Sequence, residues 1–83
     1  MSHFSVESWR RFIDANGVGS VLDATVVQVV PFGAFLEVAP GVHGLWHHAE
    51  WSPESAAPAI GSTVSVRILA VDDERHRVSL AAA

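Results

Sequence analysis

The sequence predicts an all-β fold, a small five-stranded barrel preceded by a short α-helix. Two observations predict the barrel. Five short stretches rich in β-branched residues follow one another between residues 21 and 80, and a single longer connection, residues 52–61, separates the third from the fourth. The clearest of them, residues 63–71, alternates polar and apolar side chains from Thr63 to Ile68, which is the pattern of a strand with one buried face. Strands in this number and arrangement are typical of a small closed barrel of the OB type.

The first 16 residues predict a separate element, an amphipathic helix packed on the barrel domain of residues 17–83. Ser5 is a suitable N-cap and Asn16-Gly17 a suitable stop. A helix of about three turns is marginal alone in water, so its apolar side chains should pack on the barrel. These side chains recur at helical spacing and are Val6, Trp9, Phe12 and Ile13.

The strands follow from runs without helix or turn breakers, bounded by turn signals. A charged hairpin loop, residues 72–77, precedes the last strand, and the connection of residues 52–61 could hold a helical turn begun by Ser52 and Pro53. The predicted strands are residues 21–30, 34–38, 42–46, 63–71 and 78–80.

The corner between the first two strands carries two aromatic rings. Pro31 lacks a backbone N–H and Gly33 tolerates strained backbone angles, so the chain can bend sharply and approach another group closely. Phe32 and Phe35 lie three apart across this corner. We expect at least one ring outside the core, where an unpaired base could stack on it. The alternative is that both rings belong to the core.

Length and composition limit the other possibilities. A chain of 83 residues makes one domain, and the absence of Cys excludes disulfides and thiolate metal sites and favours a cytoplasmic location. Residues 1–17 contain no unbroken apolar run, so we expect neither a signal peptide nor a membrane span. The formal charge of −4 argues against bulk attraction to nucleic acid or an anionic membrane. All five cations are Arg, which suits bidentate phosphate contacts and ring stacking.

Several short motifs follow one another along the chain. They are Gly19-x-Val21, Val30-Pro31-Phe32-Gly33-Ala34-Phe35, Gly41-Val42-x-Gly44-Leu45-x-His47, Gly61, and Val71-Asp72 followed by Arg77-Val78-Ser79-Leu80. In this order and at these intervals, they resemble the S1 domain family. The resemblance covers about residues 17–81 and implies a five-stranded OB-fold barrel that binds RNA, as in a bacterial small-subunit ribosomal protein.

The resemblance also implies an RNA-binding face of rings, an imidazole and a hairpin with an acid and a base. Rings stack on bases, and an Arg can pair with a phosphate or stack as a planar cation. The chain departs from the family in having no Lys on this face and in carrying Ala24 where Gly is common. Carried over by position, the site residues are Phe32, Phe35, His47, Asp72 and Arg77, with Arg75 as a second cation.

Other residue clusters have less specific patterns. His43, His47, His48 and Glu50 could be read as metal ligands, but their spacing matches no zinc pattern, and we expect exposed loop histidines and no metal or other cofactor. No nucleophile stands with an evident base and no Gly-rich phosphate loop precedes a helix, so we expect no enzyme.

The Trp residues admit two readings. Trp46 and Trp51 could plug the end or side of the barrel, or could join Trp9 in an exposed aromatic patch at a protein interface. The first reading leaves RNA, at the ribosome or in RNA processing, as the expected partner. The second belongs to a rival hypothesis, a protein-interaction module of the same fold that docks a basic partner.

Overall fold

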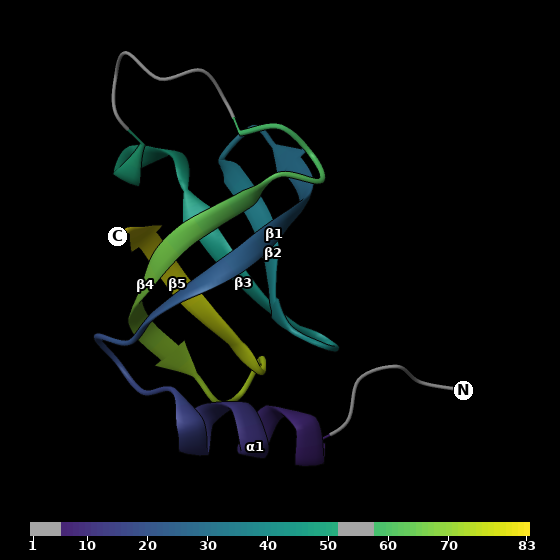
Figure 1. Cartoon of the computed structure of the whole chain (residues 1–83), viewed down its shortest axis with the longest axis vertical. Coiled ribbons are helices and arrows are strands. Elements are labelled where there is room, and N and C mark those ends of the chain that lie inside the picture. Colours follow the sequence, from purple (N-terminus) through teal and green to yellow (C-terminus); the bar gives the residue numbers. More distant parts are fainter. Residues whose placement is uncertain (1–5, 52–57) are drawn as a thin grey trace.

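The computed structural model describes residues 6–51 and 58–83, and these form a closed five-stranded barrel with a helix at one end (Figure 1). The strands neighbour one another in the order β1-β2-β3-β5-β4, and every pairing is antiparallel except that of β3 with β5. The predicted barrel is confirmed. The elements are α1 (Val6–Ala15), β1 (Val21–Val30), β2 (Gly33–Ala39), β3 (Val42–His47), the 3-10 helix η1 (His48–Glu50), β4 (Thr63–Asp72) and β5 (Arg77–Ala82).

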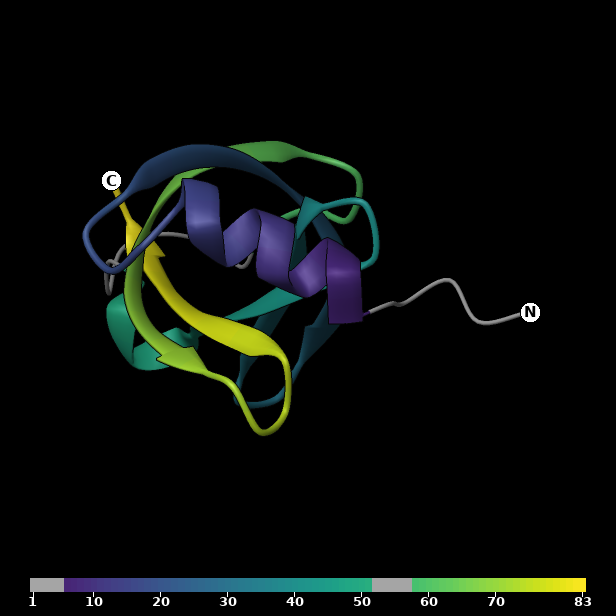
Figure 2. The ribbon, with the colours of Figure 1, turned by 90° about the horizontal axis from the view of Figure 1, so that it is seen from below.

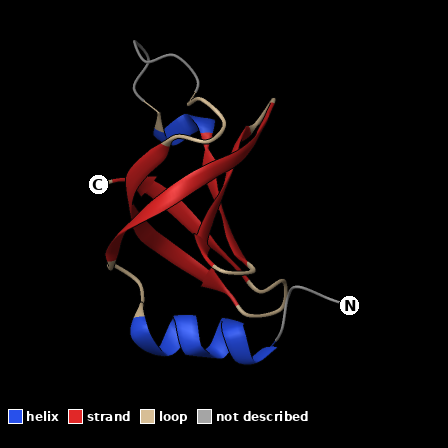
Figure 3. Ribbon diagram, turned by 45° about the vertical axis from the view of Figure 1, so that its right-hand side comes forward, coloured by secondary structure: helices blue, strands red, loops and turns tan. Residues whose placement is uncertain are grey.

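Strands make up most of the described molecule (Figure 3), and they lie close to where the sequence predicts them. β1 has the predicted limits. Each of the other four strands is one to three residues longer than predicted. η1 was not predicted. The helical turn expected at Ser52 and Pro53 and the N-cap expected at Ser5 lie outside the described residues. In the described parts of the chain, no helix is long and apolar enough to span a membrane.

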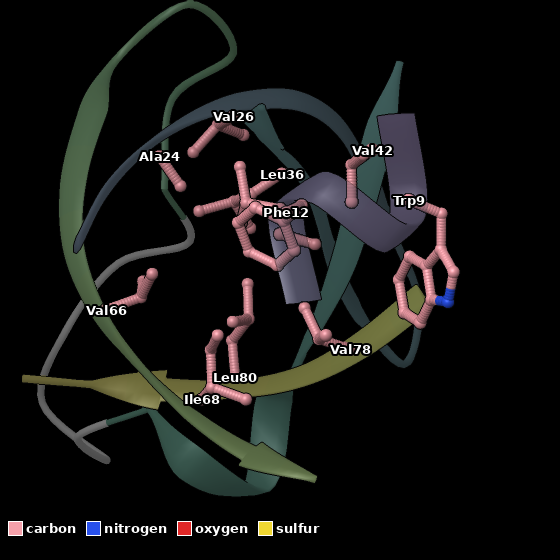
Figure 4. Close-up of a cluster of buried hydrophobic side chains, with 12 residues drawn as sticks. Trp9, Phe12, Ala24, Val26, Leu36, Val42, Val66, Ile68, Val78 and Leu80 are labelled. Carbon is pink, nitrogen blue, oxygen red and sulfur yellow. The ribbon is translucent and has the colours of Figure 1, made fainter. Parts of the chain in front are cut away.

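The core fills the barrel with the inward-facing side chains of all five strands (Figure 4). Alternation along each strand selects them, since successive residues point to opposite faces. Each large side chain removed from water contributes about 1.5–3 kcal/mol. The fully buried ones are Leu36, Ile68, Leu80, Val26, Val42, Val66 and Val78.

A β-bulge in β1 redirects the side chains near its end. The pairing with β2 shifts register between Val26 and Gln28, so one extra residue, Val27, is inserted. Val26 is buried, whereas Val27 and Gln28 both stand in solvent. Gln28 lies opposite Phe35 on the outer face of the sheet.

Gly33 allows the close approach predicted for it but has no strained backbone angles. Its φ is not positive. The described glycines with a positive φ are Gly19, Gly41 and Gly61. A Cβ on Gly33 would instead come within 2.5 Å of the Trp46 carbonyl oxygen on β3. The position therefore needs a glycine because two backbones approach closely, and Pro31-Phe32 forms the turn.

The helix α1 lies across one open end of the barrel (Figure 2). Trp9 and Phe12 are buried and Ile13 packs against them, while Glu7, Arg10, Arg11 and Asp14 face solvent. The amphipathic spacing explains both sets. The helix therefore closes the barrel end and does not cover Phe32, which lies near the other end.

Trp46 lies near the end of β3 and Trp51 directly follows η1, the 3-10 helix at the end of the barrel opposite to α1 (Figures 1 and 3). Their rings meet edge to face with centroids 5.8 Å apart, and both pack partly buried against the core. Trp9 is only 2% exposed and belongs to the helix end. An exposed patch of all three indoles is therefore wrong, because the barrel separates Trp9 from the other two.

Candidate nucleic-acid interface

The outer faces of the neighbouring strands β2, β3 and β5 carry three of the sequence-predicted site residues, Phe35, His47 and Arg77. Strand register sets their order. Across the sheet, Phe35 lies opposite Gln28 on one side and Leu45 on the other. Glu37 lies opposite His43, which in turn lies opposite Arg77 on β5. Residues from four strands thus form lateral rows on one surface.

Phe32 and Phe35 form an edge-to-face pair on this surface. Their ring centroids are 6.1 Å apart at an interplanar angle of 90°. Phe32 is 47% exposed and Phe35 is half-buried, so the expectation of a ring outside the core is confirmed. The His48 N–H donates to the Phe32 carbonyl at 3.0 Å and holds the turn that presents the ring. Such rings can stack on unpaired bases of any sequence.

A hollow of about 530 Å³ lies beside Phe35, and Phe32 is not among the residues that line it. One part of its wall is an apolar strand surface. The other part consists of cationic and imidazole side chains from β3 and from the β4–β5 hairpin, here residues 72–77, which comprise the loop 73–76 and the strand residue on each side of it. A ring can stack on a base, and a nearby cation can pair with the phosphate beside it. This combination therefore suits a nucleotide. The described lining residues are Val27, Gln28, Phe35, Gly41, His43, Arg75, His76 and Arg77.

Asp72 organises the hairpin that carries the two cations. Its carboxylate accepts hydrogen bonds from the backbone N–H groups of Glu74 at 3.1 Å and Arg75 at 3.2 Å. It also pairs with the Arg75 guanidinium at 3.3 Å. The Arg75 N–H is the main cause that lowers the pKa of Asp72 below its usual value of 3.8, and the guanidinium charge adds to it. Asp72 thus shapes the hairpin and partly neutralises Arg75, while Arg77 faces the hollow directly.

His47 lies on the same face but not in the hollow. Its register partner is Gly33, at the Phe32 end of the sheet. Its Nδ1 accepts a hydrogen bond from the Ala49 N–H at 3.1 Å, which caps η1 and leaves Nε2 as the donor of a neutral ring. His47 lies four positions along β3 from His43, about 13 Å at the usual rise per residue. The predicted residues are therefore spread over the face and do not form one compact pocket.

Three polar residues that line the hollow, Gln28, His43 and His76, were missed as RNA-site residues. Gln28 comes outward through the bulge in β1, which the sequence does not signal. His43 faces outward because Val42 and Gly44 face the core. The alternation in Val42-His43-Gly44-Leu45 could have placed it. Among the residues that the structure describes, no three metal-ligating side chains come together to hold an ion.

Comparison with known proteins gives matches to the barrel domain. A model of the S1 RNA-binding domain matches residues 16–82. The small ribosomal subunit protein bS1 of Staphylococcus saprophyticus is 45% identical over 67 residues, which cover 75% of this chain and 17% of that protein. The bS1 protein of Mycobacterium leprae is 34% identical over 80 residues, which cover 89% of this chain and 16% of that protein. The chain thus spans about one sixth of the length of these relatives.

Solved structures agree. GSP13 of Bacillus subtilis superposes with a TM-score of 0.70 at 31% identity, over 78% of this chain and 54% of that one. A chain in the a/eIF2alpha-aDim2p-rRNA complex of Pyrococcus horikoshii superposes with a TM-score of 0.68 at 25% identity, over 78% of this chain and 43% of that one. With a barrel of this topology, these sequence relatives and a family model over most of its length, the chain belongs to the S1 RNA-binding domain family.

Proposed function

We propose that this chain is a non-enzymatic module that binds single-stranded RNA across the outer face of β1, β2, β3 and β5, in translation or RNA processing. One observation carries the proposal: the Phe32–Phe35 pair lies next to a hollow lined by Arg75, Arg77 and His43. Bases would stack on the rings, and the phosphates that follow them would meet the guanidinium groups. The S1 family and the ribosomal relatives support both RNA and the ribosome as partners.

Each part of the face has a defined task in this proposal. Phe32 and Phe35 stack, Arg77 contacts a phosphate, and Arg75 contributes a second charge that Asp72 partly neutralises. His47 donates from Nε2 to the RNA at the Phe32 end. Gln28 adds an amide with both a donor and an acceptor beside Phe35, which suits the edge of a stacked base.

Magnitudes predict weak binding by this chain alone. Two stacked bases supply about 2–6 kcal/mol, whereas micromolar affinity needs about 8 kcal/mol. Two phosphate contacts give a slope of about −1.4 in log affinity against log salt for a single strand. The rest of the binding free energy that micromolar affinity needs must come from His47, from Arg75 and the other residues of the hollow, or from a partner that adds positive surface.

A fluorescence anisotropy titration with a labelled ten-nucleotide RNA, at 50 and 200 mM salt, tests the proposal. We expect weak binding at low salt, with a Kd on the order of tens of micromolar, and a loss of about sevenfold between the two salt concentrations. Leu69→Ala is the matched control, since Leu69 is 44% exposed on β4 and lies outside the face. No binding at 50 mM salt would overturn the proposal.

The acidic charge favours a second candidate, a protein-docking module with the same fold. Residues 17–83 carry seven acids against Arg67, Arg75 and Arg77. A basic partner would be attracted to that excess of negative charge. A chain that binds a basic protein but no RNA at 50 mM salt would select this candidate, and Trp46 and Trp51 would be the first residues to substitute.

A further inference from the structure

The helix α1 lies outside the family match, yet its central side chain reaches the hairpin that carries the proposed phosphate contacts. The match begins at residue 16, and α1 ends at Ala15. Trp9, in the middle of α1, is 2% exposed. Its indole N–H donates to the Asp73 carboxylate at 2.9 Å, across 64 residues of sequence. The helix and the hairpin are thus joined by a side-chain hydrogen bond.

A second contact joins the same Trp to the residue between the two cations. The rings of Trp9 and His76 lie with centroids 5.5 Å apart, tilted by 40°. His76 has a φ of 52°, a backbone conformation that residues other than glycine rarely adopt and that persists only where the surroundings hold it. Trp9 is one of the groups that hold it.

His76 also stands between two hollows. On one side it lines the proposed RNA-binding hollow with Arg75 and Arg77. On the other it lines a cleft between α1 and the hairpin, together with Trp9, Asp73, Arg10, Ile13 and Asp14. A displacement of His76 toward the helix side would therefore move the backbone from which both guanidinium groups extend.

Two adjacent carboxylates anchor the hairpin in different ways. Asp72 binds N–H groups inside the hairpin, at Glu74 and Arg75. Asp73 binds the indole of α1. The first contact fixes the local turn, and the second fixes the turn relative to the rest of the molecule.

We propose that α1 is a positioning element of the RNA site: the contacts of Trp9 with Asp73 and His76 hold the hairpin so that Arg75 and Arg77 face the hollow. This inference rests on the proposed function, since it assigns the helix to the same site. Trp9 touches no RNA in this scheme and acts only through the hairpin.

Substitutions that remove the Trp9–Asp73 hydrogen bond separate this positioning role from general stabilisation. Trp9→Phe keeps an apolar ring and removes the N–H donor, whereas Asp73→Ala removes the acceptor. We expect each to weaken RNA binding threefold to tenfold and to speed amide hydrogen exchange at Arg75 and His76. Asp73→Asn keeps an oxygen acceptor, so it should bind RNA within twofold of the wild type. The double variant of Trp9→Phe and Asp73→Ala should lose no more than the worse single variant, because both remove one contact.

Phe12→Leu supplies the control for helix packing. Phe12 is buried beneath α1, and the cleft that it lines faces the β2–β3 turn and not the hairpin. Phe12→Leu should lower the free energy of unfolding, while RNA affinity and amide hydrogen exchange in the hairpin stay at wild-type values.

Three outcomes would overturn the inference. Folded Trp9→Phe and Asp73→Ala proteins with wild-type affinity and exchange would show that the Trp9–Asp73 hydrogen bond positions nothing. An equal loss of affinity in Phe12→Leu would show a general effect of stability. If the wild type binds no RNA, the proposed function fails, and unchanged hairpin exchange in Asp73→Ala would then refute the positioning role independently.

Discussion

Two aromatic pairs in this barrel have similar geometry and different surroundings. Phe32–Phe35 and Trp46–Trp51 both meet edge to face, at centroid distances of 6.1 and 5.8 Å. The Phe pair lies beside a hollow with two guanidinium groups, and one of its rings is 47% exposed. The Trp pair packs against the core, and neither indole N–H has a hydrogen-bond partner among the described residues. Ring geometry therefore does not distinguish a binding platform from a structural plug; exposure and nearby charge do.

The largest expected effect is on the Trp pair. Trp46→Ala should lower the free energy of unfolding by about 3 kcal/mol, the lower end for a large aromatic because Trp46 is only half-buried. Urea denaturation followed by circular dichroism measures it, with Leu69→Ala as an exposed control that should change stability by about 0.5 kcal/mol or less. A Trp46→Ala protein as stable as the wild type, but defective in binding a partner, would make the Trp pair an interface instead.

The Phe pair should show the opposite pattern. Phe32→Ala combined with Phe35→Ala should weaken RNA binding at least thirtyfold, which corresponds to about 2 kcal/mol of lost stacking from two rings. Anisotropy titration measures the affinity, and circular dichroism shows whether the barrel remains folded. Unchanged affinity in a folded double variant would remove both rings from the site.

The cationic side of the Phe pair should give a smaller effect with a distinct signature. Arg77→Ala should weaken binding to all RNA sequences alike and reduce the salt slope by about 0.7, the value for one phosphate contact on a single strand. Arg67→Ala is the matched control, because Arg67 lies on the outer face of β4 and does not line the hollow. A slope that changes equally in both variants would mean that only net charge matters.

The smallest effect concerns the carboxylate that shapes the hairpin. The pKa of Asp72 is lowered in the folded chain, so its contribution to stability is present above the usual value of 3.8 and is lost as the pH falls through the lowered pKa. The Arg75 amide resonance in NMR spectra should therefore titrate with a midpoint below 3.8. Asp72→Asn should abolish this titration; a midpoint at or above 3.8 would contradict the hydrogen bonds described here.

Local sequence patterns predicted the barrel well. The breaker-free run of β1 and the strict alternation in β4 gave nearly correct limits, because each pattern depends on which face of a strand is buried. Pro31 and the Phe on each side of Gly33 likewise marked the corner. These features depend on neighbours within a few residues, which the sequence shows directly.

Features that depend on distant pairings were not predictable. The bulge at Val27 is set by the register with β2, and the need for Gly33 by the Trp46 carbonyl opposite. The same holds for the indole of Trp9, whose hydrogen-bond acceptor lies 64 residues away. The candidate site follows this division: the family motif supplied Phe32, Phe35 and Arg77, local alternation could have supplied His43, and only the strand register added Gln28.

Closure of the sheet determines how any partner can recognise this molecule. Among the described residues, each of the five strands has a hydrogen-bonded neighbour on both sides, so the barrel offers no whole strand edge to which a foreign strand could add. Partners must therefore bind through side chains on the outside of the barrel or at its ends. Those side chains can be exchanged without disturbing the backbone ladder, so the affinity and sequence preference of this small scaffold can change while its fold stays the same.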